Sequence, residues 1–142
     1  MQDPTPEQFA VQTLSPYLNR LLDSYADELN ESSRKRKAFF VFLFGGINGF
    51  AVARGLTVEQ AQVVAVSLLY QDLSIPPMDG LRVVEFGVAA AAGETPWSYA
   101  AHAGVDEFFS WQANPSAYDP GRLRLVLDRA PEIDEPEAEQ SV

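Results

Sequence analysis

The amino-acid sequence predicts an all-α fold, a compact bundle of about six helices, from three observations. At four candidate helix starts, a residue able to cap a helix is followed directly by proline. The capping side chain accepts a hydrogen bond from a free amide of the first turn, and proline next to it has no N–H to leave unpaired. Apolar residues recur at intervals of three and four, and a glycine that can end a helix stands just before a threonine that can start one. The four pairs are Thr5-Pro6, Ser15-Pro16, Thr95-Pro96 and Asp119-Pro120.

The first predicted helix covers residues 6–29. Gln8 stands three residues after Thr5 and completes a capping box. We expect the helix to be kinked or broken at Pro16, because proline lacks the backbone N–H and its ring clashes with the preceding turn. Its apolar stripe consists of Leu14, Tyr17, Leu18, Leu21, Leu22, Tyr25 and Leu29.

Residues 34–73 are predicted to form an apolar helical hairpin at the centre of the bundle. Its first helix contains AFFVFLFGGINGFAVA, and Arg54-Gly55-Leu56 supplies the cation, glycine and apolar residue typical of a helix C-terminus. Thr57 and Gln60 then form a second capping box. The following helix, residues 58–73, is apolar nearly all round, which is typical of a helix buried on every side.

Three shorter helices are expected after the hairpin. Asp79 is predicted to cap a helix that Gly93 ends. Thr95-Pro96 is predicted to start another, which Gly104 interrupts. After a loop, residues 120–129 are predicted to form the last short helix.

The chain of 142 residues is predicted to be one helical domain, residues 1–130, followed by a tail. Residues 131–142 read PEIDEPEAEQSV. A segment so rich in acids and proline buries too little apolar surface to offset the entropy of ordering, so we expect an acidic, disordered tail.

The net charge of −10, from 20 acidic and 10 basic residues, indicates a basic partner. Such a chain is repelled by nucleic acid and by anionic lipid surfaces, so we expect neither as a partner. Residues 55–119 carry eight acids but only one base, Arg82. The run Arg34-Lys35-Arg36-Lys37 either balances the acids of the preceding turn or makes a functional contact, and the sequence does not decide which. The polar N-terminus favours a cytoplasmic location.

The apolar run 38–53 has a membrane alternative that we do not favour. Sixteen helical residues rise about 24 Å, which is short of a hydrocarbon core of about 30 Å, and Asn48 lies within the run. A buried helix explains the same residues, with Gly45, Gly46 and Gly49 letting a neighbouring helix approach closely. An oligomeric helical scaffold, packed through this helix, is a further alternative.

The composition excludes most catalytic centres, and we predict no enzyme, cofactor or metal site. With no cysteine and one histidine, the chain has no thiolate chemistry and no multi-histidine zinc site. The enzyme alternative that remains is an all-α, magnesium-dependent nucleotide hydrolase, in which Asp27, Glu28 and Glu31 would hold the metal through carboxylates.

A partner-binding surface is predicted in the segment 94–119, which mixes aromatic residues with carboxylates. Aromatic side chains supply packing at an interface, and carboxylates steer a basic partner towards it. The predicted contact residues are Glu94, Trp97, Tyr99, Asp106, Glu107, Trp111, Tyr118 and Asp119.

In size, helicity and acidity, the chain resembles the small acidic immunity proteins that bacteria make against their own toxins. The resemblance implies a protein that binds a basic cognate toxin tightly and occludes its active site without catalysing a reaction itself.

Overall fold

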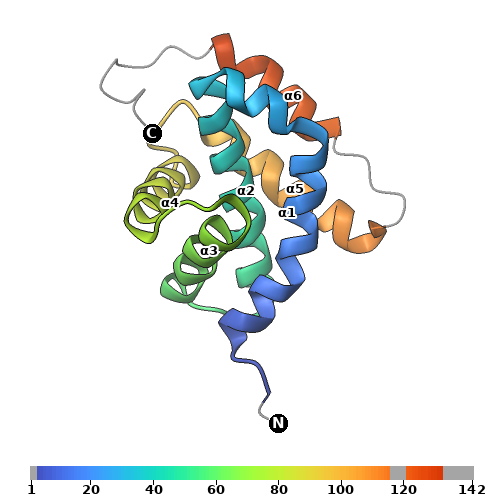
Figure 1. Ribbon diagram of the computed structural model, residues 1–142, viewed down its shortest axis with the longest axis vertical. Coiled ribbons are helices and arrows are strands. Elements are labelled where there is room, and N and C mark those ends of the chain that lie inside the picture. Colours follow the sequence, from blue (N-terminus) through green and yellow to red (C-terminus); the bar gives the residue numbers. More distant parts are fainter. Residues whose placement is uncertain (1–2, 116–120, 133–142) are drawn as a thin grey trace.

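The computed structural model describes residues 3–115 and 121–132, and these residues contain helices and no strand. The predicted all-α fold is therefore confirmed. Six α-helices and one short 3-10 helix follow one another along the chain (Figure 1). They are α1 (Pro6–Glu31), α2 (Ser33–Ala53), α3 (Val58–Leu73), α4 (Pro77–Ala91), α5 (Ser98–Ala113), α6 (Gly121–Arg129) and η2 (Ala130–Glu132).

α1 begins as predicted and continues through Pro16, so of the two outcomes expected there the break is wrong and the kink stays a prediction. The Thr5 hydroxyl accepts from the N–H of Gln8 at 3.1 Å, and the Gln8 side chain accepts from the N–H of Thr5 at 2.9 Å. Pro16 is exposed, whereas Tyr17, Leu18 and Leu21 are fully buried. Packing of this apolar stripe outweighs the backbone hydrogen bond that proline cannot make.

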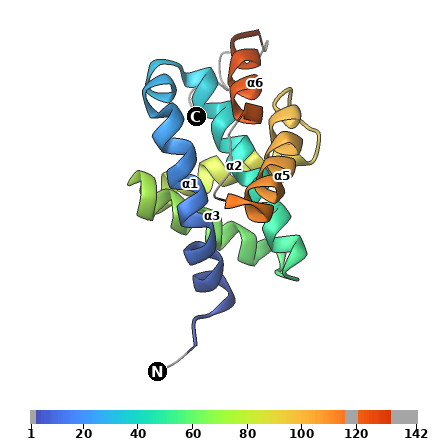
Figure 2. The same ribbon diagram turned by 90° about the vertical axis from the view of Figure 1, so that its right-hand side faces the viewer.

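α2 runs through the middle of the molecule, as both ribbon views show (Figures 1 and 2). It begins ahead of the apolar run, because the Ser32 hydroxyl caps it by accepting from the N–H of Lys35 at 3.2 Å. Thirteen of its 21 residues are buried. By length and composition α2 could cross a membrane, but a core helix passes the same test, and 67% of its most apolar 18 residues are buried inside the protein.

The most extensive helix contact joins α2 to α5 and depends on glycine. A Cβ added at Gly45 would overlap the backbone carbonyl of Ala101, and one added at Gly104 would overlap that of Phe42. The predicted close approach at the α2 glycines is confirmed, and the neighbour is α5. Gly104 does not interrupt α5, contrary to the prediction, because it serves this contact within a continuous helix.

α3 completes the predicted hairpin with α2 but is not buried on every side. Ala61, Val64 and Leu68 face the core. On the outer face, Val63 is 52% exposed and Tyr70 is 60% exposed. Within the described residues, the apolar outer face of α3 is covered by no other element.

The ends of the shorter helices differ in part from the prediction. α4 begins at Pro77, and Asp79 lies inside its first turn instead of capping it. Gly93, with φ of +82°, ends α4 as predicted. The Thr95 hydroxyl accepts from the N–H of Trp97 at 3.1 Å, and α5 follows from Ser98.

η2 extends the described helical structure to Glu132, two residues into the predicted tail. The remainder of that tail, residues 133–142, lies outside the described residues, as does the cap-proline pair Asp119-Pro120. The prediction of a disordered tail therefore stays a prediction.

Candidate partner-binding surface

The segment predicted to bind a partner is partly in the core. Trp97 is fully buried, and Glu107 is 1% exposed and pairs with Arg122 at 3.5 Å. Tyr99 is half-buried and donates its hydroxyl to the carbonyl oxygen of Val126 at 3.1 Å. Burial raises the pKa of Tyr99 to about 12. These three side chains hold α5 and α6 in place, and a partner cannot reach Trp97 or Glu107 in this structure.

The other predicted contact residues are more accessible. Glu94 and Asp106 are exposed. Trp111 is half-buried against Tyr17, with ring centroids 5.3 Å apart. Tyr118 and Asp119 lie outside the described residues. For Glu94 and Asp106, partner binding stays a prediction, but the structure does not join them to an exposed aromatic anchor at Trp97.

The basic run at the start of α2 faces the protein itself. Arg34 donates to the carbonyl oxygen of Pro131 at 2.8 Å, and Arg36 to that of Leu29 at 3.0 Å. Lys35 pairs with Glu28, and Lys37 is fully buried with its ammonium 5.7 Å from the ring centre of Phe86. These contacts tie α2 to α1, α4 and η2. The basic run therefore has a structural role, which is one of the two alternatives that the sequence did not decide between.

Glu28 is the shared partner of two cations from different helices. Lys35 of α2 and Arg124 of α6 both pair with its carboxylate. The hydrogen bond from Arg124 is the main cause that lowers the pKa of Glu28 to about 2. A magnesium ion at Asp27, Glu28 and Glu31 would have to displace both cations. Within the described residues, no group of three or more histidine, aspartate or glutamate side chains is placed to hold a metal ion.

Exposed carboxylates form a stripe along the C-terminal half of α1, which we name the α1 acidic stripe: Asp23, Asp27 and Glu31. Their spacing of four places them one above another on the same side of the helix. None of the three forms an ion pair within residues 3–115 and 121–132. Their charge therefore stands uncompensated at the surface.

An apolar hollow of about 250 Å³ lies beside this stripe, between α1, α2 and the end of α3. Leu22, Ala26 and Asn30 of α1 line it and alternate with the acidic residues along the helix. Its other lining residues are Leu29, Arg36, Phe39, Phe40 and Leu73. An apolar hollow with carboxylates at its edge has the arrangement of an interface centre, where an apolar anchor is buried inside a polar rim.

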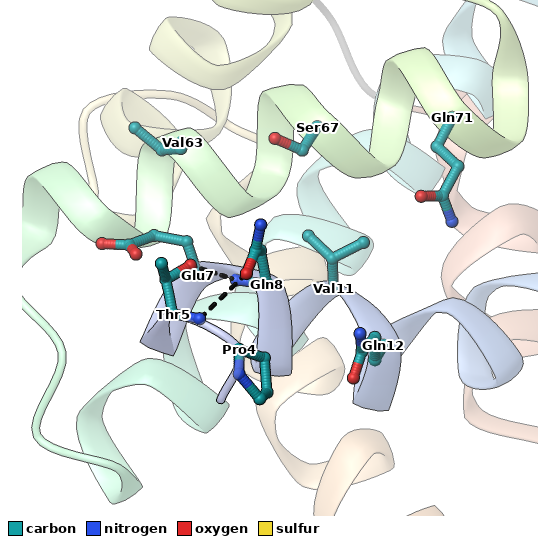
Figure 3. A pocket seen from close by; sticks show the side chains of 9 residues that line it. All are labelled: Pro4, Thr5, Glu7, Gln8, Val11, Gln12, Val63, Ser67 and Gln71. Carbon is teal, nitrogen blue, oxygen red and sulfur yellow. Dashed lines mark hydrogen bonds between the residues drawn. The ribbon is translucent and has the colours of Figure 1, made fainter. Parts of the chain in front are cut away.

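A larger groove, of about 730 Å³, separates the first half of α1 from α3 (Figure 3). Val63, Ser67 and Gln71 follow one another along α3, opposite the α1 residues that line the other side. The remaining lining residues are Pro4, Thr5, Glu7, Gln8, Val11 and Gln12. The groove is therefore walled mainly by neutral polar side chains, contains one carboxylate, and has no basic residue in its lining.

Sequence reasoning missed both the stripe and the groove. The stripe has a visible signal, because Asp23, Asp27 and Glu31 follow one another at intervals of four along a predicted helix. The groove has a weaker signal, in that Ser67 and Gln71 follow Val63 at intervals of four and place polar side chains on a helix predicted to be apolar nearly all round. Neither signal shows which side of α1 faces outward, because that depends on the packing of α3.

The fold and the surface together define a class of protein: small all-α proteins whose exposed charged groups are mainly carboxylates. Within this class, the family model for Immunity protein 48 matches residues 8–119, so the chain belongs to the Immunity protein 48 family. The resemblance to immunity proteins that size, helicity and acidity predicted is confirmed. The match covers nearly all of α1 to α5 and excludes α6. No curated protein and no solved structure matches the chain.

Proposed function

We propose that this protein neutralises a cognate toxin by binding it without catalysis, and that the toxin surface it contacts is basic. Family membership supports the toxin as partner. One structural observation supports a basic partner. Most basic side chains of this protein contact other parts of the same chain, whereas many of its carboxylates face solvent.

Eight of the ten basic residues contact a carboxylate, a backbone carbonyl or an aromatic ring of the chain itself. Arg54, for example, lies 4.8 Å from the ring centre of Phe9, and Arg129 lies 4.4 Å from that of Tyr99. The eight are Arg34, Lys35, Arg36, Lys37, Arg54, Arg122, Arg124 and Arg129. Among residues 3–115 and 121–132, three acids take part in the ion pairs, namely Glu28, Glu107 and Asp128. The charge offered to a partner is therefore strongly negative.

The outer face of α1 is the proposed docking surface. The α1 acidic stripe attracts lysine and arginine side chains, and the apolar hollow beside it accepts an apolar anchor. Carboxylates at an interface rim accelerate association mainly by steering, whereas the buried anchor contributes most of the affinity. A toxin that acts on an anionic substrate has such a basic face, and occupation of that face would block the substrate.

The test begins with capture of the toxin from the native host at low salt, followed by its identification. Expression of the captured protein should stop growth of a test strain, and co-expression of this chain should restore it. Purified proteins should form a complex whose association rate falls as salt is raised. A captured protein that is harmless, or whose toxicity this chain does not relieve, would contradict the proposal.

A pair of variants then tests the docking surface. Neutralisation of the stripe (Asp23→Asn, Asp27→Asn, Glu31→Gln) should slow association at low salt by roughly tenfold. The matched control removes the same charge elsewhere (Asp79→Asn, Glu85→Gln, Glu132→Gln) and should slow it by roughly twofold or less. Equal effects of the two variants would show that net charge matters and that the stripe is not the contact.

A further inference from the structure

The groove between α1 and α3 differs from the rest of the surface because it is open while both of its ends are fixed. At one end, the amide of Gln60 donates to Glu7 at 2.9 Å. At the other end, the hydroxyl of Ser15 donates to Asp72 at 2.9 Å. These two contacts show that α1 and α3 run parallel, and between them the helices leave the open volume shown in Figure 3.

Glu7 is the carboxylate within the groove lining, and Asp72, which directly follows the lining residue Gln71, is held by Ser15 next to the lining at the other end. Hydrogen bonding to its own backbone N–H, and then to Gln60, lowers the pKa of Glu7, so this side chain is ionised at neutral pH. A carboxylate has about four acceptor sites, so Glu7 keeps the capacity to accept from a further donor besides Gln60 and its own backbone. Glu59, which is exposed on the first turn of α3, adds charge at the same end.

An anionic occupant is disfavoured even though two helix N-termini lie at this end. In each of α1 and α3, the capping box already uses the N–H of the capping threonine and the N–H of the glutamine three residues later. Glu7 and Glu59 offset the positive ends of the two helix dipoles. Because the lining contains no lysine or arginine, an anion would have no cationic partner there.

The walls favour an extended peptide. Gln12 and Gln71 offer amide donors and acceptors that match a peptide backbone, and Val11 and Val63 offer apolar contact. The eight residues from Glu7 to Ser15 rise about 12 Å along α1, and an extended chain covers that distance in about four residues. Side chains four residues apart in an extended segment point to the same side.

Resting on the proposed function, we propose that the groove between α1 and α3 binds an extended segment of the toxin with two lysine or arginine side chains about four residues apart. One cation pairs with Glu7 and the other with Asp72, while the backbone between them lies against the glutamines. The groove would thereby give specificity for one toxin, because only a segment with this spacing of cations fits it. The α1 acidic stripe provides a general attraction for basic proteins.

A peptide titration tests the groove without the toxin. The probe is the acetylated and amidated pentapeptide Lys-Thr-Val-Thr-Lys, and its counterpart is Glu-Thr-Val-Thr-Glu. The lysine peptide should cause saturable amide shifts in the NMR spectrum at Gln8, Gln12, Ser67 and Gln71, with at least roughly fivefold tighter binding than the glutamate peptide. Shifts elsewhere only, or equal binding of both peptides, would overturn the proposal.

A variant tests the groove with the identified toxin. Val63→Arg places a cation in the groove and should weaken toxin binding by roughly tenfold or more, whereas Val63→Leu should bind nearly as the unmodified protein does. Leu125→Arg on α6 is the control, because Leu125 is also exposed and lies outside the groove. Circular dichroism and thermal unfolding establish that each variant is folded.

The two proposals fail in different ways. If the unmodified protein binds and neutralises a toxin but Val63→Arg does so equally well, the groove proposal is wrong and the proposed function stands. If the unmodified protein neutralises no toxin, the proposed function is wrong. In that case the peptide titration tests the groove proposal independently. Saturable binding of the lysine peptide at the groove residues supports the groove proposal, and absence of such binding overturns it.

Discussion

The outer face of α1 and the segment around α5 contain similar residues, carboxylates among apolar and aromatic side chains, but the fold uses them in opposite ways. On α5, Glu107 is buried and Trp97, just before the helix, is fully enclosed. On α1, Asp23 and Asp27 are exposed and form no ion pair with any residue that the structure describes. α5 is drawn into the bundle by its glycine contact with α2, whereas α1 buries one stripe and leaves its other side open.

The comparison shows that the composition of a segment does not define an interface. Asp106 and Glu107 are neighbours in the sequence, yet one is exposed and the other is buried, because consecutive residues of a helix differ by about 100° around its axis. Only the position of α2 against α5 decides which of the two meets solvent.

The largest effect is expected from a change that separates α5 from α2. Gly104→Val places side-chain atoms against the backbone of Phe42 and should lower the free energy of unfolding by about 3–5 kcal/mol. Urea denaturation followed by circular dichroism measures it. Gly121→Ala is the control, because an added Cβ there meets nothing within 4 Å, and it should change stability by less than about 1 kcal/mol.

A charge reversal at two adjacent positions sharpens the comparison within α5. Glu107→Lys leaves Arg122 facing a second cation in a buried position and should cost about 3 kcal/mol of stability. Asp106→Lys should leave stability within about 0.5 kcal/mol and, if α5 contacts the toxin, slow association. Thermal unfolding separates the two variants. Equal destabilisation by both would mean that Asp106 is also buried.

A smaller effect is expected from Glu28, where α1 is tied to α2 and α6. Because its pKa is lowered from 4.5 to about 2 in the folded protein, its ion pairs stabilise the fold above pH 4.5. That contribution is lost as the pH falls from about 4.5 towards 2. Glu28→Gln should reduce stability by about 1–2 kcal/mol at pH 7 and flatten this pH dependence.

Asp27→Asn is the matched control for this measurement, since Asp27 is the neighbouring residue, is exposed and forms no ion pair within the described part of the chain. It should leave the pH dependence of stability unchanged. A similar loss from both variants would show that Glu28 acts only through the overall charge of α1.

Much of the fold could be predicted from local patterns. The capping boxes at Thr5 and Thr57, the stop at Gly93 and the apolar stripes gave the number and order of the helices. The interruption predicted at Gly104 is wrong, as is a break at Pro16, because the effect of these residues depends on contacts made far away in the sequence. The candidate site was harder to predict, since nothing local to Trp97 distinguishes a core tryptophan from an interface anchor.

By itself, the sequence determined that the chain is helical, acidic and without thiol or multi-histidine chemistry, because these properties follow from residue types and their spacing. The tertiary structure alone decided which charges are displayed. It turned Arg34, Lys35 and Arg36 towards the protein, left the α1 acidic stripe outside, and opened the groove beside α3. Whether a side chain is exposed depends on how the helices pack against each other. A sequence pattern that repeats every turn marks one face of a helix, but it does not specify which neighbouring helix covers that face.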